Sequence, residues 1–144
     1  MSTKLCSIEL KVKDYLTNEE GSFSYHGEVV VIDYDLRQYD FRFYDTDAGT
    51  LLVSIDASKD ICKVVEQNDN INLQMNLKKD EIHPCIYRLD KSNALLLETK
   101  AFGLDFIDNQ IILEYDLFDK NDVEHVNPLT RNIVKIDFEG EKAC

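Results

Sequence analysis

The chain has 144 residues, of which 44% are hydrophobic and only five are Gly and two Pro, so we expect one domain over residues 1–144. Its 28 acidic and 16 basic residues give a net charge of −12. Nucleic-acid binding needs clustered Lys and Arg, but the longest basic cluster, Lys78-Lys79, is followed at once by Asp80-Glu81. The charge therefore argues against nucleic acid and against an anionic membrane surface as partners, and indicates a solubilising acidic shell.

The N-terminal segment MSTKLCSIELKVKDYL alternates as a strand does, without the continuous apolar core and small-residue cleavage site of a signal peptide. No run approaches the roughly 18 apolar residues of a membrane span. Cys6, Cys62, Cys85 and Cys144 lie far apart without paired spacing. We therefore expect reduced thiols in a cytoplasmic protein, although an even count also permits two disulfides.

Apolar and polar residues alternate along most of the chain, which is typical of half-buried strands. In chain order, the first half gives alternating segments at residues 5–12, 22–34, 39–46, 50–56, 61–67 and 71–77. The stretch 57–67 has a helical alternative, with Ser58 as its cap and apolar residues at 61, 64 and 65. Its β-branched Ile and Val residues favour the strand.

The second half repeats the pattern at residues 83–89, 94–100, 102–107, 110–117 and 133–140. Between the last two lies one long polar loop, FDKNDVEHVNPLTRN, in which a single helical turn is an option over 122–128. Alternation assigns one set of side chains to the interior: Leu95, Leu97, Ile111, Leu113 and Tyr115. The set predicted to meet water is Glu98, Glu114 and Asp116.

About ten short strands with brief turns, and no spacing for a strand–helix–strand unit, predict an all-β protein. The sheet is antiparallel, and we expect an up-and-down β-barrel or, alternatively, a sandwich. Closure into a barrel is favoured because it removes sheet edges that would otherwise offer unpaired backbone groups. A barrel of this size encloses space for side chains or for one small ligand.

The order of these elements resembles the YwiB-like family of small bacterial proteins, which have a lipocalin-like (calycin) barrel and no established function. The resemblance rests on Tyr87, on LLLET ending at Thr99, on IILEYDL with Tyr115 and Asp116, and on the final IVKIDFEG. Upstream, FYDTDAG is similar to an aromatic, acid and glycine element of that family. The match covers most of the chain and implies a lipocalin-like barrel.

The chain departs from that family at one turn. The family pattern has an Arg-x-Gly turn about twenty residues before the tyrosine that corresponds to Tyr87. This chain has Gln67, Asn68 and Asp69 at that turn. Any ligand contact that such an arginine makes in relatives is therefore missing from this sequence.

Signatures of catalysis and of metal binding are missing from the sequence. It has no serine within a nucleophile elbow, no Gly-rich phosphate loop, no His-Glu-x-x-His and no Cys-x-x-Cys. The three histidines, His26, His83 and His125, fall in different segments. We therefore expect no catalytic residues, no metal, no cofactor and no enzymatic activity.

The aromatic residues in the apolar phase of their strands are the better candidates for a site. Four of them are predicted to contact a ligand: Tyr25, Phe43, Tyr87 and Tyr115. An inward tyrosine brings a hydroxyl that needs a hydrogen-bond partner, either within the barrel or on a ligand. Simple core packing explains the same pattern and stays open as the alternative.

Two functions follow from this architecture. The first is a barrel that binds a small apolar or amphipathic ligand in its lumen, oriented by inward tyrosines. The second is a structural or protein–protein interaction module with a solidly packed barrel, which docks a protein partner through its outer face or the acidic loop 119–130.

Overall fold

The computed structural model describes residues 4–33, 35–46, 49–67, 72–88 and 94–139. Their ten strands form one closed antiparallel barrel in which each strand pairs with its neighbours in the chain and the first pairs with the last. The strands are β1 (Lys4–Asp14), β2 (Glu19–Asp33), β3 (Gln38–Thr46), β4 (Gly49–Asp56), β5 (Ile61–Gln67), β6 (Asn72–Lys78), β7 (Ile82–Arg88), β8 (Ala94–Ile107), β9 (Gln110–Asp119) and β10 (Thr130–Phe138).

This architecture confirms the predicted all-β antiparallel barrel. The described residues contain no helix, so the helical alternatives over 57–67 and 122–128 are wrong. The segments 94–100 and 102–107, predicted as separate strands, form the single strand β8, with a register shift between Ala101 and Gly103.

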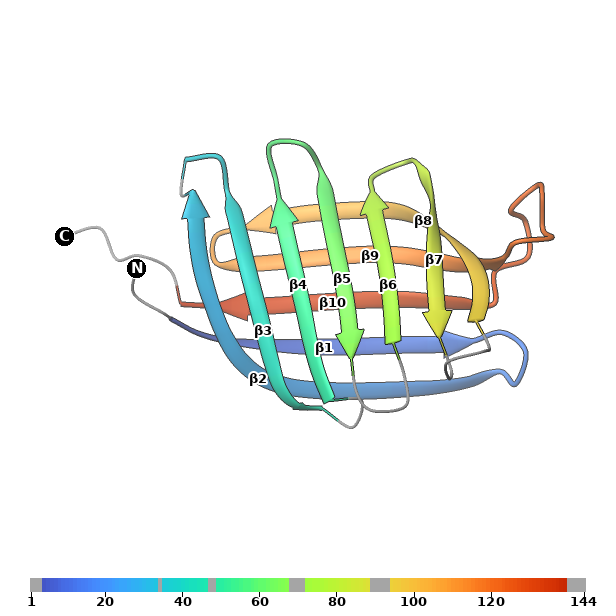
Figure 1. Cartoon of the computed structure of the whole chain (residues 1–144), viewed down its shortest axis with the longest axis horizontal. Coiled ribbons are helices and arrows are strands. Elements are labelled where there is room, and N and C mark those ends of the chain that lie inside the picture. Colours follow the sequence, from blue (N-terminus) through green and yellow to red (C-terminus); the bar gives the residue numbers. More distant parts are fainter. Residues whose placement is uncertain (1–3, 34, 47–48, 68–71, 89–93, 140–144) are drawn as a thin grey trace.

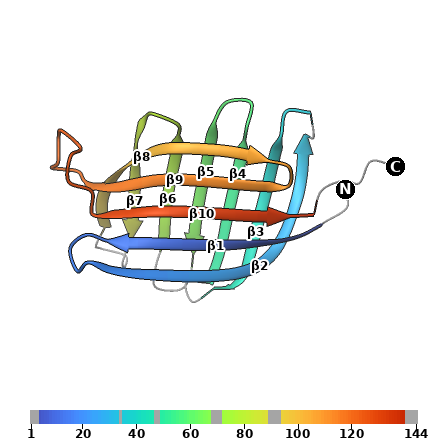
Figure 2. The same ribbon diagram turned by 180° about the vertical axis from the view of Figure 1, so that it is seen from behind.

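The barrel is flattened into two layers whose strands run in different directions. Strands β3 to β7 form one layer, and β1, β9 and β10 cross behind it (Figure 1). The view from behind shows β2 and β8 curving at opposite sides to join the layers (Figure 2). Accordingly, β2 pairs with β1 along its first eleven residues but with β3 only from Gly27 onward.

Gly27 occupies the point where β2 changes partners. A Cβ atom built there would lie 2.0 Å from the carbonyl oxygen of Arg42 on β3. Real Cβ atoms do not approach backbone atoms so closely, and only glycine permits the contact. The bend that brings β3 onto β2 thus depends on a missing side chain.

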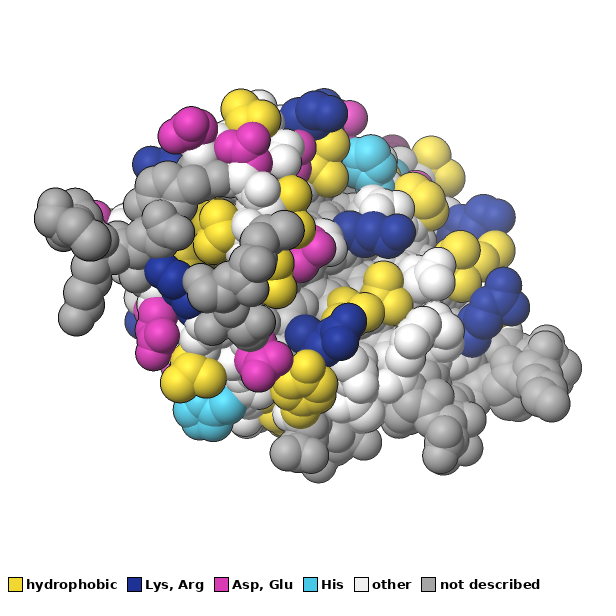
Figure 3. All heavy atoms as spheres, turned by 60° about the vertical axis from the view of Figure 1, so that its left-hand side comes forward, with side chains coloured by type: hydrophobic (Ala, Val, Ile, Leu, Met, Phe, Trp, Pro, Cys, Tyr) yellow, Lys and Arg dark blue, Asp and Glu magenta, His cyan; other side chains and the backbone are white. Residues whose placement is uncertain are grey.

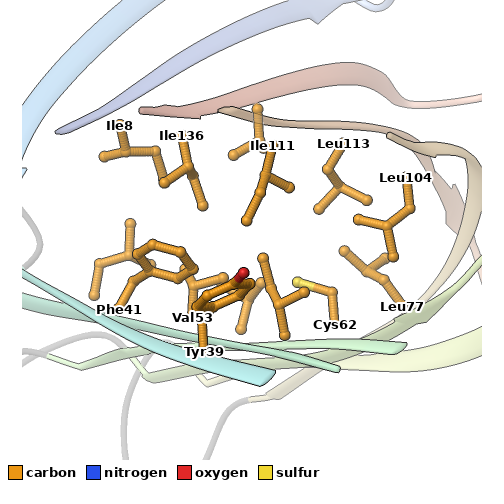
Figure 4. Close-up of a cluster of buried hydrophobic side chains, with 14 of the residues drawn as sticks. Ile8, Tyr39, Phe41, Val53, Cys62, Leu77, Leu104, Ile111, Leu113 and Ile136 are labelled. Carbon is orange, nitrogen blue, oxygen red and sulfur yellow. The ribbon is translucent and has the colours of Figure 1, made fainter. Parts of the chain in front are cut away.

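The two layers pack through their inward-facing apolar side chains, which meet across the lumen in Figure 4. Aromatic rings fill one part of this core. The Phe41 ring stacks on that of Phe43 with centroids 6.3 Å apart, and Phe138 packs edge-on against Phe41 at 5.6 Å. Tyr39 lies against Phe138 at 5.0 Å. This part of the lumen is filled with side chains.

Pro84 interrupts the pairing of β6 with β7. The ladder ends at Met75 and Cys85, because a proline has no N–H to offer the next carbonyl. The hydroxyl of the fully buried Thr99 lies 3.2 Å from the carbonyl oxygens of both Asn76 and His83, between which it shares its single proton. The buried Thr99 hydroxyl therefore has acceptors within the barrel wall, as a buried polar group requires.

The connection between β9 and β10, residues 120–129, covers part of the outer face of the barrel. Phe118, although on the outward phase of β9, is buried, and the His125 ring packs edge-on against it with centroids 5.1 Å apart. The Nε2 atom of His125 lies 3.3 Å from Oε1 of Glu98 on β8. The connection therefore lies against the barrel wall rather than extending into solvent.

Two expectations about side-chain exposure are wrong. Asp116 was expected to meet water but is 2% exposed, because Arg131 on β10 covers it and the adjacent Phe118 is buried. Leu95 was expected inside but is 49% exposed; it lies one residue from the start of β8, where its partner on β7 is the half-buried Tyr87.

Candidate binding cavity inside the barrel

A half-open cavity of about 350 Å³ lies inside the barrel, near the ends of β1, β5 and β9 and the starts of β4, β6 and β10. Its volume falls at the lower end of the roughly 300–1,000 Å³ typical of small-molecule sites. Most of the lining is apolar and comes from both layers, including Ile8, Val53, Val64, Met75, Leu113 and Val134.

The lumen is hollow here because of the side chains that the strands place inside. The opposite part of the barrel receives the rings of Tyr39, Phe41 and Phe138, which fill it. Around the cavity the inward positions of the layer β4 to β6 carry shorter aliphatic groups, such as Leu51, Val53 and Val64. Those side chains reach less far toward the opposite layer and leave a space.

Glu66 is the acidic side chain among the described lining residues. It follows Cys62 and Val64 on the inward phase of β5, and its register partners are Leu51 on β4 and Leu73 on β6. Burial raises the pKa of the Glu66 carboxyl above its usual range. A carboxylate surrounded by aliphatic neighbours is costly unless it has a partner, so Glu66 is the most distinctive polar group of the cavity.

Tyr115 and Asn132 face the cavity from the opposite layer. Tyr115 on β9 is 6% exposed, and its pKa is raised chiefly by burial, with further contributions from Cys85, Cys62 and Glu66. The Asn132 side-chain amide on β10 donates a hydrogen bond of 2.9 Å to the hydroxyl of Thr130. The apolar cavity thus has a small number of polar groups, as ligand sites commonly do.

The structure brings together two of the four predicted ligand-contacting residues: Tyr25 and Tyr115 both line the cavity. Phe43 is fully buried in the core and does not line it. Tyr87 is half-buried on β7 beside Leu73, a lining residue, without lining the cavity itself.

The sequence reasoning missed Glu66 and Asn132. Both were detectable by parity, since Glu66 follows Cys62 and Val64 at spacing two, and Asn132 precedes Val134 and Ile136 at the same spacing. At the turn where the resemblance indicated a departure, Gln67 is exposed, and Asn68 and Asp69 lie outside the described residues.

The cysteines of the described chain are buried free thiols. Burial raises the pKa of Cys6 and Cys62 to about 12 and that of Cys85 to about 11. Since the thiolate is the reactive form, these groups are poor nucleophiles at neutral pH. Among the residues in the structure, no three His, Cys, Asp or Glu side chains gather closely enough to hold a metal ion.

The half-buried Glu66 carboxyl predicts a pH-dependent effect on stability. Because its folded-state pKa is raised, the folded protein holds this proton more tightly than the unfolded chain, so the charged form destabilises the fold as pH rises. We expect Glu66→Gln to raise the free energy of unfolding at pH 7, and the gain to vanish below about pH 4, where glutamate is protonated in both states. Urea denaturation at several pH values measures this, and a gain independent of pH would contradict it.

Comparisons with known proteins agree with the fold. The structure is similar to the crystal structure of the ywiB protein from Bacillus subtilis, with a TM-score of 0.64 and 14% sequence identity. The similarity covers 96% of this chain and 93% of the other. No family model matches the sequence, and no curated protein matches it. The described residues include no helix able to cross a membrane.

Proposed function

We propose that this protein binds a small apolar or amphipathic molecule in the barrel cavity. The observation that supports this best is the half-open, mainly apolar cavity of about 350 Å³, which the inward side chains leave unfilled. A barrel packed solidly by its own side chains would favour the interaction or structural module instead. We also propose membership of the YwiB-like family with its lipocalin-like barrel, supported by the fold similarity to ywiB.

The proposed role is binding without catalysis, in the cytoplasm. The described lining residues include no serine, cysteine or histidine that would act as nucleophile or base. The three buried free thiols support a reducing compartment. The side chains on one face of the molecule mix hydrophobic, acidic and basic types (Figure 3), as expected of a surface in contact with water.

A cavity-filling substitution tests the proposal. Leu73 lines the cavity from β6 and is half-buried, so Leu73→Trp places a larger side chain in the space. We expect the neutral fluorescent probe N-phenyl-1-naphthylamine to bind the unmodified protein and to bind Leu73→Trp about tenfold more weakly, because its volume is displaced. Fluorescence titration measures both affinities.

The neighbouring residue provides the matched control. Gln74 is exposed on the outer phase of β6, so Gln74→Trp adds the same side chain outside the barrel. Probe affinity should then stay at the level of the unmodified protein. Absence of probe binding to the unmodified protein, or equal loss in both variants, would overturn the proposal; circular dichroism shows that each variant is folded.

A further inference from the structure

We infer that the cavity selects an amphipathic cation, that is, a hydrocarbon body with one ammonium or similarly charged group, and that Glu66 is its ionic partner. This inference rests on the proposed function and specifies the chemical class of the ligand. It follows from the position of Glu66, from the other polar groups of the lining and from the charge of the whole chain.

Glu66 is half-buried and lines the cavity. It faces inward between Leu51 and Leu73, both of which also line the cavity. No hydrogen bond or ion pair joins its carboxylate to any residue that the structure describes, and burial is the cause of its raised pKa. An opposite charge on a ligand would stabilise the ionised form. The ligand group that compensates this half-buried carboxylate is therefore a cation.

The remaining polar groups of the lining suit such a ligand. Tyr115 lines the same cavity from β9, and Glu66 is a further, smaller cause of the raised pKa of its phenol after burial. Asn132 also lines the cavity; its amide nitrogen donates to Thr130, and its side-chain carbonyl oxygen is an acceptor. An ammonium group has three donors and no acceptor, and it matches acceptors of this kind.

The basic residue in the lining does not reverse this preference. Lys11 belongs to the outward phase of β1, its side chain is 63% exposed, and its ammonium lies 3.4 Å from the Glu9 carboxylate. Its charge is therefore shared with Glu9 and solvent rather than directed into the lumen. The net charge of −12 adds a field that attracts cations and repels anions. A fatty-acid carboxylate would meet repulsion both at the surface and at Glu66.

The test compares three molecules with the same hydrocarbon chain and different head groups. Octylammonium, octanol and octanoate each displace N-phenyl-1-naphthylamine from the protein at pH 7.5 in a fluorescence competition assay. We expect octylammonium to bind about tenfold or more tightly than octanol, since a charge-assisted hydrogen bond contributes this much, and octanoate to bind more weakly than both.

Two variants test whether Glu66 causes the preference for octylammonium over octanol. In Glu66→Gln the affinity for octylammonium should fall to the level of the affinity for octanol measured in the same variant. Glu114→Gln removes the same charge from an exposed position on β9 and controls for attraction to the acidic surface. It should retain the cation preference.

The outcomes separate the two proposals. A probe that binds inside the barrel without any preference for octylammonium over octanol would overturn the cation inference and leave the binding function intact. Retention of the preference in Glu66→Gln would also overturn it. Failure of the probe to bind the unmodified protein would overturn both.

Discussion

Gly27→Ala is expected to lower the free energy of unfolding by more than about 3 kcal/mol, the largest effect of any substitution considered for this protein. The added methyl group would lie 2.0 Å from the Arg42 carbonyl oxygen and 2.9 Å from the Cα of Phe43. Both atoms belong to the backbone of β3, so a side-chain rotation cannot relieve the clash. Relief requires β2 and β3 to separate where β2 first pairs with β3.

Guanidinium denaturation followed by circular dichroism measures this loss. Gly103→Ala on β8 is the control, because a Cβ there would lie 3.6 Å from the Asp105 carboxylate, an ordinary contact. We expect it to be neutral or to stabilise by up to about 1 kcal/mol through reduced freedom of the unfolded chain. A similar loss in both variants would show that the close approach at Gly27 is not the cause.

Arg131→Gln is expected to lower the free energy of unfolding by roughly 2–3 kcal/mol. Arg131 donates hydrogen bonds of 2.9 Å and 3.1 Å to the two carboxylate oxygens of Asp116, whose side chain is 3% exposed. The substitution leaves this carboxylate buried without its cation. The estimate lies below that for a fully buried pair because half of the Arg131 side chain is exposed.

The neighbouring positions provide controls for the ion pair. Lys135→Gln removes a positive charge from an exposed position on the same phase of β10 and should change stability by less than about 0.5 kcal/mol. Adding Asp116→Asn to Arg131→Gln should recover part of the loss, because the uncompensated charge is then removed. Equal effects of Arg131→Gln and Lys135→Gln in urea denaturation would contradict the role of the pair.

The strand pattern was predictable because pleated strands place successive side chains on opposite faces. Cys6 and Ile8 are buried as their phase requires, and so are Ile111 and Leu113. The alternation of side chains along a strand does not specify which other residues cover its outer face. Asp116 was therefore misassigned, since its burial depends on Arg131, fifteen residues later, and on a connection that folds back over β9.

The cavity was only partly predictable. Alternation placed Tyr25 and Tyr115 inside the barrel but could not show how far side chains from the two layers reach toward each other. That depends on the bend of β2 at Gly27 and on how the layers cross. Phe43 and Tyr25 have the same inward phase, yet one is sealed in the core and the other reaches the cavity. Glu66 was not predicted as a cavity residue, because composition does not distinguish one acidic residue from the other acidic residues among the 28 in the chain.

The pairing of β1 with β10 has a consequence for the time course of folding. This ladder joins Cys6 to Phe138 and Asp14 to Thr130, so the circle closes through contacts between residues far apart in the chain. Such contacts carry a high loop-closure entropy and give β topologies of high contact order refolding times of milliseconds to seconds. During synthesis on the ribosome, the barrel cannot close until β10 has emerged. The apolar faces of the earlier strands are therefore not fully buried before that point.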